Sequence, residues 1–174
     1  MAKKYNFSAG PAILPTEVIQ EAAAAVANWQ DSGLSILEVS HRGKPFVAVL
    51  EEAMSLAKEL LNLPDSYKVL FLTGGASSQF YMTAMNLLNN DGKAGYVNTG
   101  AWSTKAIKEA NHFGTAEVLA SSEDKNFSYI PKGYDIPADL SYLHLTSNNT
   151  IFGTELHELP NTTCLLYTSD AADE

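Results

Sequence analysis

The sequence predicts an α/β protein, built as a mostly parallel sheet with helices on both faces. Two observations carry this prediction. From about residue 45 onwards, segments with helical periodicity alternate with short apolar segments, which is typical of parallel strands joined by crossover helices. One such run, Val69–Leu72, contains no polar residue, as expected for a strand buried on both faces of a sheet.

The composition is that of a globular domain with a core, since 45% of the residues are hydrophobic and 18% are charged. A net charge of -9 argues against nucleic acid and anionic membranes as partners. The single cysteine, Cys164, excludes a disulfide framework and a Cys-x-x-Cys metal site, so we expect no metal. No apolar run is long enough to span a bilayer, and polar residues follow Met1–Lys4 where a signal peptide would be apolar. We therefore expect a cytoplasmic protein.

The first part of the chain predicts an irregular arm followed by two helices. Residues 1–14 form the arm, because Gly10-Pro11 is incompatible with a helix. Pro15–Trp29 is predicted as the first helix, with Trp29 in the core, and Ile36–Val39 as a short extended stretch. Pro45 begins the second helix, which keeps the three–four spacing of one buried face as far as Leu61.

The rest of the chain predicts the alternating part of the fold. A third helix begins near Ser77 and stops before the polar residues 89–92. Ser103 is a candidate cap for a helix that runs to His112. The other predicted elements are strands at Ala94–Val97, Thr115–Leu119 and Tyr142–Thr146, a polar surface excursion at 120–137 with a short strand near Ser128–Ile130, and a turn at Ser147–Thr150.

Three polar turns are predicted beyond the carboxyl ends of strands, where ligands bind in open α/β sheets: Gly74–Ser78, Asn98–Ser103 and Ser147–Thr150. In the first, two glycines lead from a strand into a helix N-terminus, whose free N–H groups and dipole attract a phosphate. The spacing is neither that of a dinucleotide fingerprint nor that of a P-loop. A plain strand–turn–helix connection without a ligand is the alternative.

Two further side chains are candidates for ligand binding. Arg42 is the only arginine and offers a planar fork for a carboxylate or phosphate, with His41 beside it. A solvated loop with surface ion pairs is the alternative. Trp102 follows a predicted strand and can stack on a flat cofactor ring, although core packing is the commoner fate of tryptophan. His144 alternates within a strand and is predicted to be a hydrogen-bonded structural residue.

Four segments together resemble class V aminotransferases, which depend on pyridoxal 5'-phosphate (PLP), and in particular those that act on a phosphorylated amino acid. They are Asn6–Ala12, Ser40–Arg42, Gly74–Phe80 and Gly100–Ala110. The resemblance extends from about Lys4 to Pro160. It implies that 15–161 form part of the large PLP-binding domain of a fold-type I transferase, preceded by the arm of residues 1–14.

The resemblance also implies roles for particular residues. Ala76 and Ser77 match the positions whose backbone amides hold the PLP phosphate, and Trp102 matches the tryptophan that stacks on the pyridine ring. Thr150 matches a threonine that hydrogen-bonds near the pyridoxal hydroxyl. Arg42 matches the arginine that binds the substrate carboxylate, with His41 near the substrate phosphate.

The implied reaction is amino transfer between O-phosphoserine and 2-oxoglutarate, giving 3-phosphooxypyruvate and glutamate. It belongs to serine biosynthesis, and relatives also serve pyridoxine biosynthesis. The resemblance further implies a homodimer. A different class V enzyme, such as a cysteine desulfurase, is one alternative, and the Ser40–Arg42 element disfavours it. A non-catalytic fragment is the other.

The sequence departs from this family after Asn161. There the family has an aspartate for the pyridinium nitrogen and, further on, the lysine that forms the Schiff base. None of the ten lysines lies in that lysine motif, so no catalytic residue is assigned and the chain as written is expected to be inactive. Residues 162–174 match nothing expected of the family and are predicted to be a foreign, artefactual tail. Asp170 and Asp173 therefore receive no role.

Overall fold

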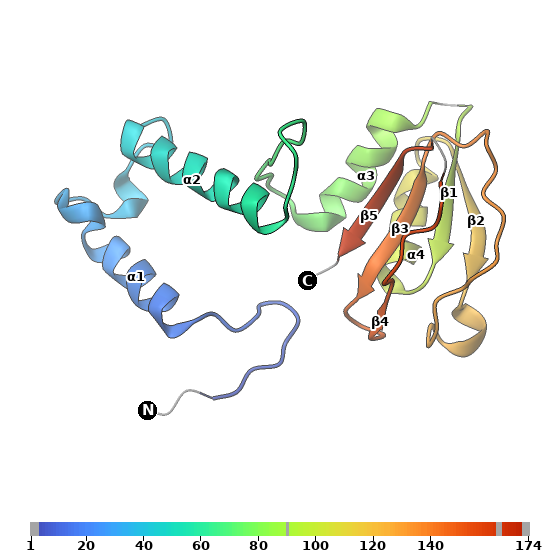
Figure 1. The fold of residues 1–174 in the computed structure, drawn as a ribbon, viewed down its shortest axis with the longest axis horizontal. Coiled ribbons are helices and arrows are strands. Elements are labelled where there is room, and N and C mark those ends of the chain that lie inside the picture. Colours follow the sequence, from blue (N-terminus) through green and yellow to red (C-terminus); the bar gives the residue numbers. More distant parts are fainter. Residues whose placement is uncertain (1–3, 90, 163–164, 172–174) are drawn as a thin grey trace. The chain divides into compact units, whose positions relative to one another are not determined.

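The computed structural model describes residues 4–89, 91–162 and 165–171 (Figure 1). The chain divides into two compact units. The first unit comprises residues 1–7 and 12–72, and the second comprises residues 8–11 and 73–174. Each unit is described by itself.

The first unit contains two helices, α1 (Thr16–Ala27) and α2 (Lys44–Leu60). Pro45 lies in the first turn of α2, as predicted. The first helix is shorter than predicted, because Asn28 is extended and ends α1 before Trp29. Trp29 is nevertheless buried, as expected for a core residue.

The stretch predicted as extended at Ile36–Val39 is instead a 3-10 turn over Ile36–Glu38. Ser35 causes the difference, because its side chain accepts a hydrogen bond from the backbone of Leu37 at 3.2 Å. The carboxylate of Glu38 in turn accepts one from the backbone of Ser35 at 2.9 Å. This reciprocal capping favours a helical turn over an extended chain.

The prediction of a buried strand at Val69–Leu72 is wrong. Residues 68–72 have no regular secondary structure, and Phe71 is 62% exposed. No strand of the described residues pairs with this segment. An apolar run becomes a strand only where a neighbouring strand satisfies its backbone N–H and C=O groups, and a four-residue pattern contains no information about that partner.

The second unit is built on a mostly parallel sheet, which confirms the predicted fold class (Figure 1). The strand order is β2-β1-β3-β4, and β5 also pairs with β3. All pairings are parallel except that of β3 with β4. The strands are β1 (Lys93–Asn98), β2 (Thr115–Ser121), β3 (Leu143–Asn149), β4 (Thr154–Glu155) and β5 (Tyr167–Ala171).

Strand β3 extends further than predicted, through residues that were assigned to a turn. Asn148 and Asn149 pair with the two residues of β4, so Ser147–Asn149 belong to the strand. The turn consists of residues 150–153 instead. Thr150 therefore lies immediately beyond the carboxyl end of β3.

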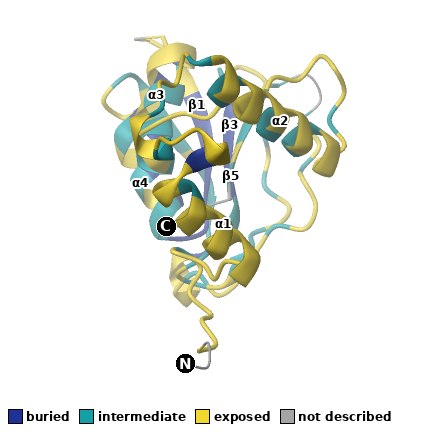
Figure 2. Cartoon of the chain, turned by 90° about the vertical axis from the view of Figure 1, so that its left-hand side faces the viewer, coloured by how far each residue is buried: buried dark blue, intermediate teal, exposed yellow. Residues whose placement is uncertain are grey.

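Two helices of the second unit, α3 (Gly75–Leu87) and α4 (Ala101–Ala110), cover one face of this sheet. Phe80 and Ala84 of α3 and Ala106 of α4 form a buried cluster with Tyr96 of β1 and Tyr142. Figure 2 shows the contrast between the buried β1 and β3 and the exposed α1 and α2. Within the second unit the opposite face of the sheet carries loops, so the described residues of this unit place helices on one face only.

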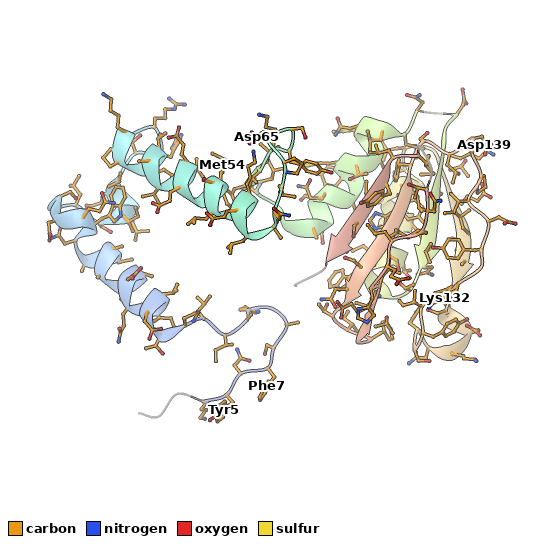
Figure 3. All side chains as sticks on the ribbon, in the orientation of Figure 1. Tyr5, Phe7, Met54, Asp65, Lys132 and Asp139 are labelled. Atoms are coloured by element: carbon orange, nitrogen blue, oxygen red, sulfur yellow. The ribbon has the colours of Figure 1, made fainter. Side chains whose placement is uncertain are left out.

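The predicted polar excursion at 120–137 forms part of the cover on that opposite face. Tyr134 and Ile136 pack against a second buried cluster, formed by Val97 of β1 with Leu143 and Leu145 of β3. The segment contains a 3-10 turn at Glu123–Lys125, and the strand suggested near Ser128–Ile130 is not formed. Just after this segment, Asp139 (Figure 3) accepts a hydrogen bond of 2.7 Å from Lys93 at the start of β1, which attaches the covering loop to the sheet.

Strand β5 lies within residues 162–174, the segment for which the sequence predicts a foreign tail. It pairs with β3 in parallel from Leu143 onwards, and Asp170 stands opposite Thr146. The pairing shows only the position of this segment in the sheet. That residues 162–174 are foreign to the family therefore stays a prediction.

Candidate functional site

At the N-terminus of α3 the structure forms a glycine turn where the sequence predicts one. Gly74 and Gly75 have φ angles of 100° and 63°, in the left-handed region that favours glycine. A Cβ atom on Gly74 would collide with the hydroxyl of Ser78. Because α3 begins at Gly75, two residues earlier than predicted, the N–H groups of Ala76 and Ser77 belong to its first turn and lack intrahelical partners.

The N-terminus of α4 is fixed by a buried serine. Ser103 accepts hydrogen bonds of 2.9 Å from the backbone N–H groups of Thr99 and Gly100. Its own hydroxyl donates to the side-chain oxygen of Asn98, also at 2.9 Å. The sequence predicts Ser103 as the residue before the helix, but α4 begins at Ala101, so Ser103 caps the helix from within its first turn.

Trp102 and Thr150 come together in this region. The indole Nε1 of Trp102 donates a hydrogen bond of 3.1 Å to the Oγ1 of Thr150, which is 48 residues further along the chain. Trp102 is half-buried and packs against the core cluster under α3 and α4. The hydroxyl of Thr150 accepts the indole proton and keeps its own proton for a further acceptor.

Lys105, which is not among the candidates predicted from the sequence, contacts two of the predicted site residues. Its Nζ donates a hydrogen bond of 2.6 Å to the Oγ of Ser77 and lies 5.6 Å from the ring centroid of Trp102. It therefore connects α4 to the first turn of α3. Its position three residues after Trp102 on one helix is the signal that would have found it, because such residues lie on the same face.

Asn149 lies at the carboxyl end of β3, next to Gly100. Its side-chain nitrogen donates to the hydroxyls of Thr99 at 3.2 Å and Thr154 at 3.1 Å. Its Oδ1 is buried and, among the described residues, has no hydrogen-bond partner. A Cβ on Gly100 would lie only 2.6 Å from this oxygen, so the position requires glycine for reasons of space.

Arg42 and His41 belong to the first unit and not to the cluster around Trp102. Both are exposed, and the backbone N–H of Arg42 donates to the hydroxyl of Ser40 at 3.3 Å. In the described part of the chain, no carboxylate lies within ion-pair distance of the Arg42 guanidinium. The four predicted cofactor residues are brought together within the second unit, and the two predicted substrate residues belong to the first.

His144 on β3 is a hydrogen-bonded structural residue, as predicted. Its Nδ1 lies 2.8 Å from the hydroxyl of Thr168, and its ring lies beside those of Phe80 and Tyr96, at 5.8 and 5.2 Å between centroids. Burial lowers the pKa of this histidine from 6.5 to about 4. Within the described ranges there is no group of three or more side chains that could hold a metal ion, and no helix long and apolar enough to cross a membrane.

A parallel sheet whose strand ends meet an open helix N-terminus, a tryptophan and a threonine is an arrangement suited to a flat, phosphorylated cofactor. The family model described as "Aminotransferase class-V" matches residues 4–172. The chain therefore belongs to the class V aminotransferases.

The similar proteins with curated names are phosphoserine aminotransferases. Those of Flavobacterium johnsoniae and Bacteroides fragilis are each 59% identical to this chain, over 161 and 154 residues. These alignments cover 92% and 88% of the chain, but only 45% and 43% of the relatives. The chain thus spans less than half the length of the curated relatives it matches.

Solved structures of phosphoserine aminotransferases also resemble this chain. The phosphoserine aminotransferase from Bacillus circulans subsp. alkalophilus matches with a TM-score of 0.91 and 45% identity, over 96% of this chain and 47% of that one. A PLP-bound phosphoserine aminotransferase from Trichomonas vaginalis matches with a TM-score of 0.86 and 33% identity, again over 96% and 47%. These matches confirm the expected fold, that of part of a fold-type I transferase.

Proposed function

We propose that this chain supplies the cofactor-binding part of a phosphoserine aminotransferase. The reaction is amino transfer between O-phospho-L-serine and 2-oxoglutarate, which yields 3-phosphooxypyruvate and L-glutamate. The observation that carries the proposal is the gathering of Ser77, Trp102 and Thr150 at the carboxyl ends of β1 and β3. The 59% identity with a phosphoserine aminotransferase supports the same substrate class.

The donors and acceptors of the site fit PLP. The first turn of α3 offers the backbone amides of Ala76 and Ser77 to a phosphate. The half-buried indole of Trp102 offers an aromatic face to the pyridine ring. Thr150 has a hydroxyl proton to donate near the pyridoxal hydroxyl, and the Oδ1 of Asn149, which has no hydrogen-bond partner among the described residues, is a buried acceptor in the same region.

When bound, PLP supplies the electron sink for amino transfer, and the protein supplies binding and orientation. The α3 N-terminus would hold the phosphate end, while Trp102 and Thr150 would fix the tilt of the ring. Arg42 would bind the substrate carboxylate with two parallel hydrogen bonds, and His41 would lie near the substrate phosphate. Fixing both reactants in this way lowers the entropic part of the barrier.

We also propose that turnover requires the part of the relatives' length that this chain does not span. None of the ten lysines matches the family's catalytic lysine, so the 174 residues alone are not expected to turn over. A homodimer in the cytoplasm, with a role in serine and pyridoxine biosynthesis, belongs to the same proposal. The single cysteine supports a reducing compartment.

The test is a hybrid enzyme. Residues 1–161 of this chain replace the matching part of the Flavobacterium johnsoniae relative, and the intact relative is the control. We expect the hybrid to convert phosphoserine and 2-oxoglutarate, and the 174-residue chain alone to show no turnover. A folded hybrid that binds PLP but does not act on phosphoserine, and acts instead on cysteine or another amino acid, would contradict the proposed substrate.

A further inference from the structure

We propose that Lys105 is a phosphate-binding residue of the cofactor site, with its ammonium group contacting a phosphate oxygen of PLP held at the N-terminus of α3. The inference rests on the proposed function and adds a residue to it. The family resemblance assigns the phosphate to the backbone amides of Ala76 and Ser77. The structure adds a side-chain cation from the neighbouring helix.

Lys105 lies against the first turn of α3. Ser77 is the third residue of α3, and the Nζ of Lys105 is 2.6 Å from its hydroxyl oxygen. The same ammonium lies 5.6 Å from the ring centroid of Trp102. One cation is therefore in contact with the phosphate end of the site and next to the residue proposed to stack on the ring.

The charges around Lys105 also favour an anion at this position. The first turn of a helix carries about half a positive charge, so an ammonium beside the α3 N-terminus is repelled unless an anion lies between them. In the ranges that the structure describes, no carboxylate lies within 4.0 Å of Lys105, and the three ion pairs involve other residues. A phosphate dianion bound here would be attracted by both the ammonium and the helix N-terminus.

The number of hydrogen-bond donors points to the same ligand. A lysine ammonium has three N–H donors, and Ser77 accepts only one of them. Because the Ser77 oxygen accepts from Lys105, its own proton remains available for another acceptor. Two ammonium protons and one hydroxyl proton are thus left for phosphate oxygens, alongside the backbone amides of the first turn of α3.

A purely structural role for Lys105, tying α4 to α3, makes a different prediction. It would affect every ligand of the site equally, whereas a phosphate contact affects only ligands that carry a phosphate. Pyridoxal, which is PLP without its phosphate, separates the two roles. Lys108 provides a matched control, because it is an exposed lysine one turn further along α4.

The experiment is to titrate the 174-residue chain and its variants with PLP and with pyridoxal, and to compare the two dissociation constants. We expect Lys105→Met to weaken PLP binding at least about tenfold, as for loss of a charge-assisted hydrogen bond, and pyridoxal binding less than about twofold. Lys105→Arg should restore most of the PLP affinity, and Lys108→Met should change neither constant. Circular dichroism checks that each variant is folded.

Equal weakening of PLP and pyridoxal binding by Lys105→Met, or no effect on PLP binding, would overturn the assignment of Lys105 and leave the proposed function standing. A wild-type chain that binds neither ligand would contradict the proposed cofactor site itself, and with it the role of Lys105. The two failures are therefore distinguishable in one set of titrations.

Discussion

The two units of this chain show the same sequence patterns with different structural outcomes. Helices α1 and α2 of the first unit follow the predicted amphipathic spacing, yet neither contains a buried residue. In the second unit, by contrast, Ala84 of α3 and Ala110 of α4 are fully buried against the sheet. A helix forms from local propensity, whereas burial of its apolar face depends on which segment faces it.

Two apolar segments make the same point for strands. The run at Val69–Leu72 was predicted as a buried strand and is exposed, while Ala94–Val97 was predicted as a strand and forms the buried centre of β1. The second segment has a strand on each side, β2 and β3. The difference lies in the partners and not in the apolar residues, so the stability of this chain should reside in the second unit.

The largest expected effect comes from truncating one leucine in each unit. Leu143 is fully buried in the cluster with Val97 and Leu145, so Leu143→Ala should lower the free energy of unfolding by about 2–5 kcal/mol. Leu56 of α2 is 48% exposed, so Leu56→Ala should cost less than about 1 kcal/mol. Urea unfolding followed by circular dichroism measures both values. Equal losses would show that α2 has a packing partner within the chain.

A smaller effect concerns acid stability, which also resides in the second unit. The ring of His144 stays neutral in the folded protein down to about pH 4, but in the unfolded chain it gains a proton below about pH 6.5. Acidification therefore stabilises the unfolded state. Between these two pH values, the free energy of unfolding should fall by at most about 1.4 kcal/mol for each pH unit.

The measurement is the urea midpoint at several pH values between 7.5 and 4.5. His144→Gln should lower the stability at pH 7 and flatten the dependence on pH, because the titrating group is gone. His112→Gln, at an exposed position, is the control and should leave the slope unchanged. A slope that persists in His144→Gln would assign the acid sensitivity to another group.

In the first unit, substitution of Arg42 should weaken the binding of both substrates. In the hybrid enzyme, Arg42→Ala should raise the KM for phosphoserine and for glutamate, since a charge-assisted contact is worth about 1.5–3 kcal/mol, or about 10- to 150-fold. Arg42→Lys keeps the charge but loses the fork, so it should recover only part of the affinity. Steady-state kinetics with both substrates would detect this change. Identical KM values for Arg42→Ala and the parent would remove Arg42 from the substrate site.

The elements that could be predicted from the sequence are those governed by local chemistry. Pro45 in the first turn of α2, the Gly74-Gly75 turn and the strands β1 and β2 follow from residue preferences over a few positions. The misplaced elements depend on distant partners. Ser147–Asn149 join β3 only because β4 returns to pair with them, and Val69–Leu72 needed a strand that the pattern could not supply.

The candidate site likewise contains residues that local patterns predict and one residue that depends on a contact between distant elements. Ala76, Ser77, Trp102 and Thr150 could be named from turns beyond strand ends and from the family resemblance. The spacing of Lys105 from Trp102 places both on one helix face, but its hydrogen bond to Ser77 joins residues 28 positions apart on different helices and could not be read from that spacing. Local patterns indicate where a ligand binds, but contacts between elements determine which additional side chains reach it.

The central claim is that the cofactor site lies in the second unit, beside Trp102, and the two tryptophans offer a direct test because each unit contains one. The measurement is PLP titration of two single-tryptophan variants, Trp29→Phe and Trp102→Phe, followed by tryptophan fluorescence. Our account predicts saturable quenching in Trp29→Phe, where only Trp102 emits. Saturable quenching of Trp29 alone, or of neither tryptophan, would contradict it.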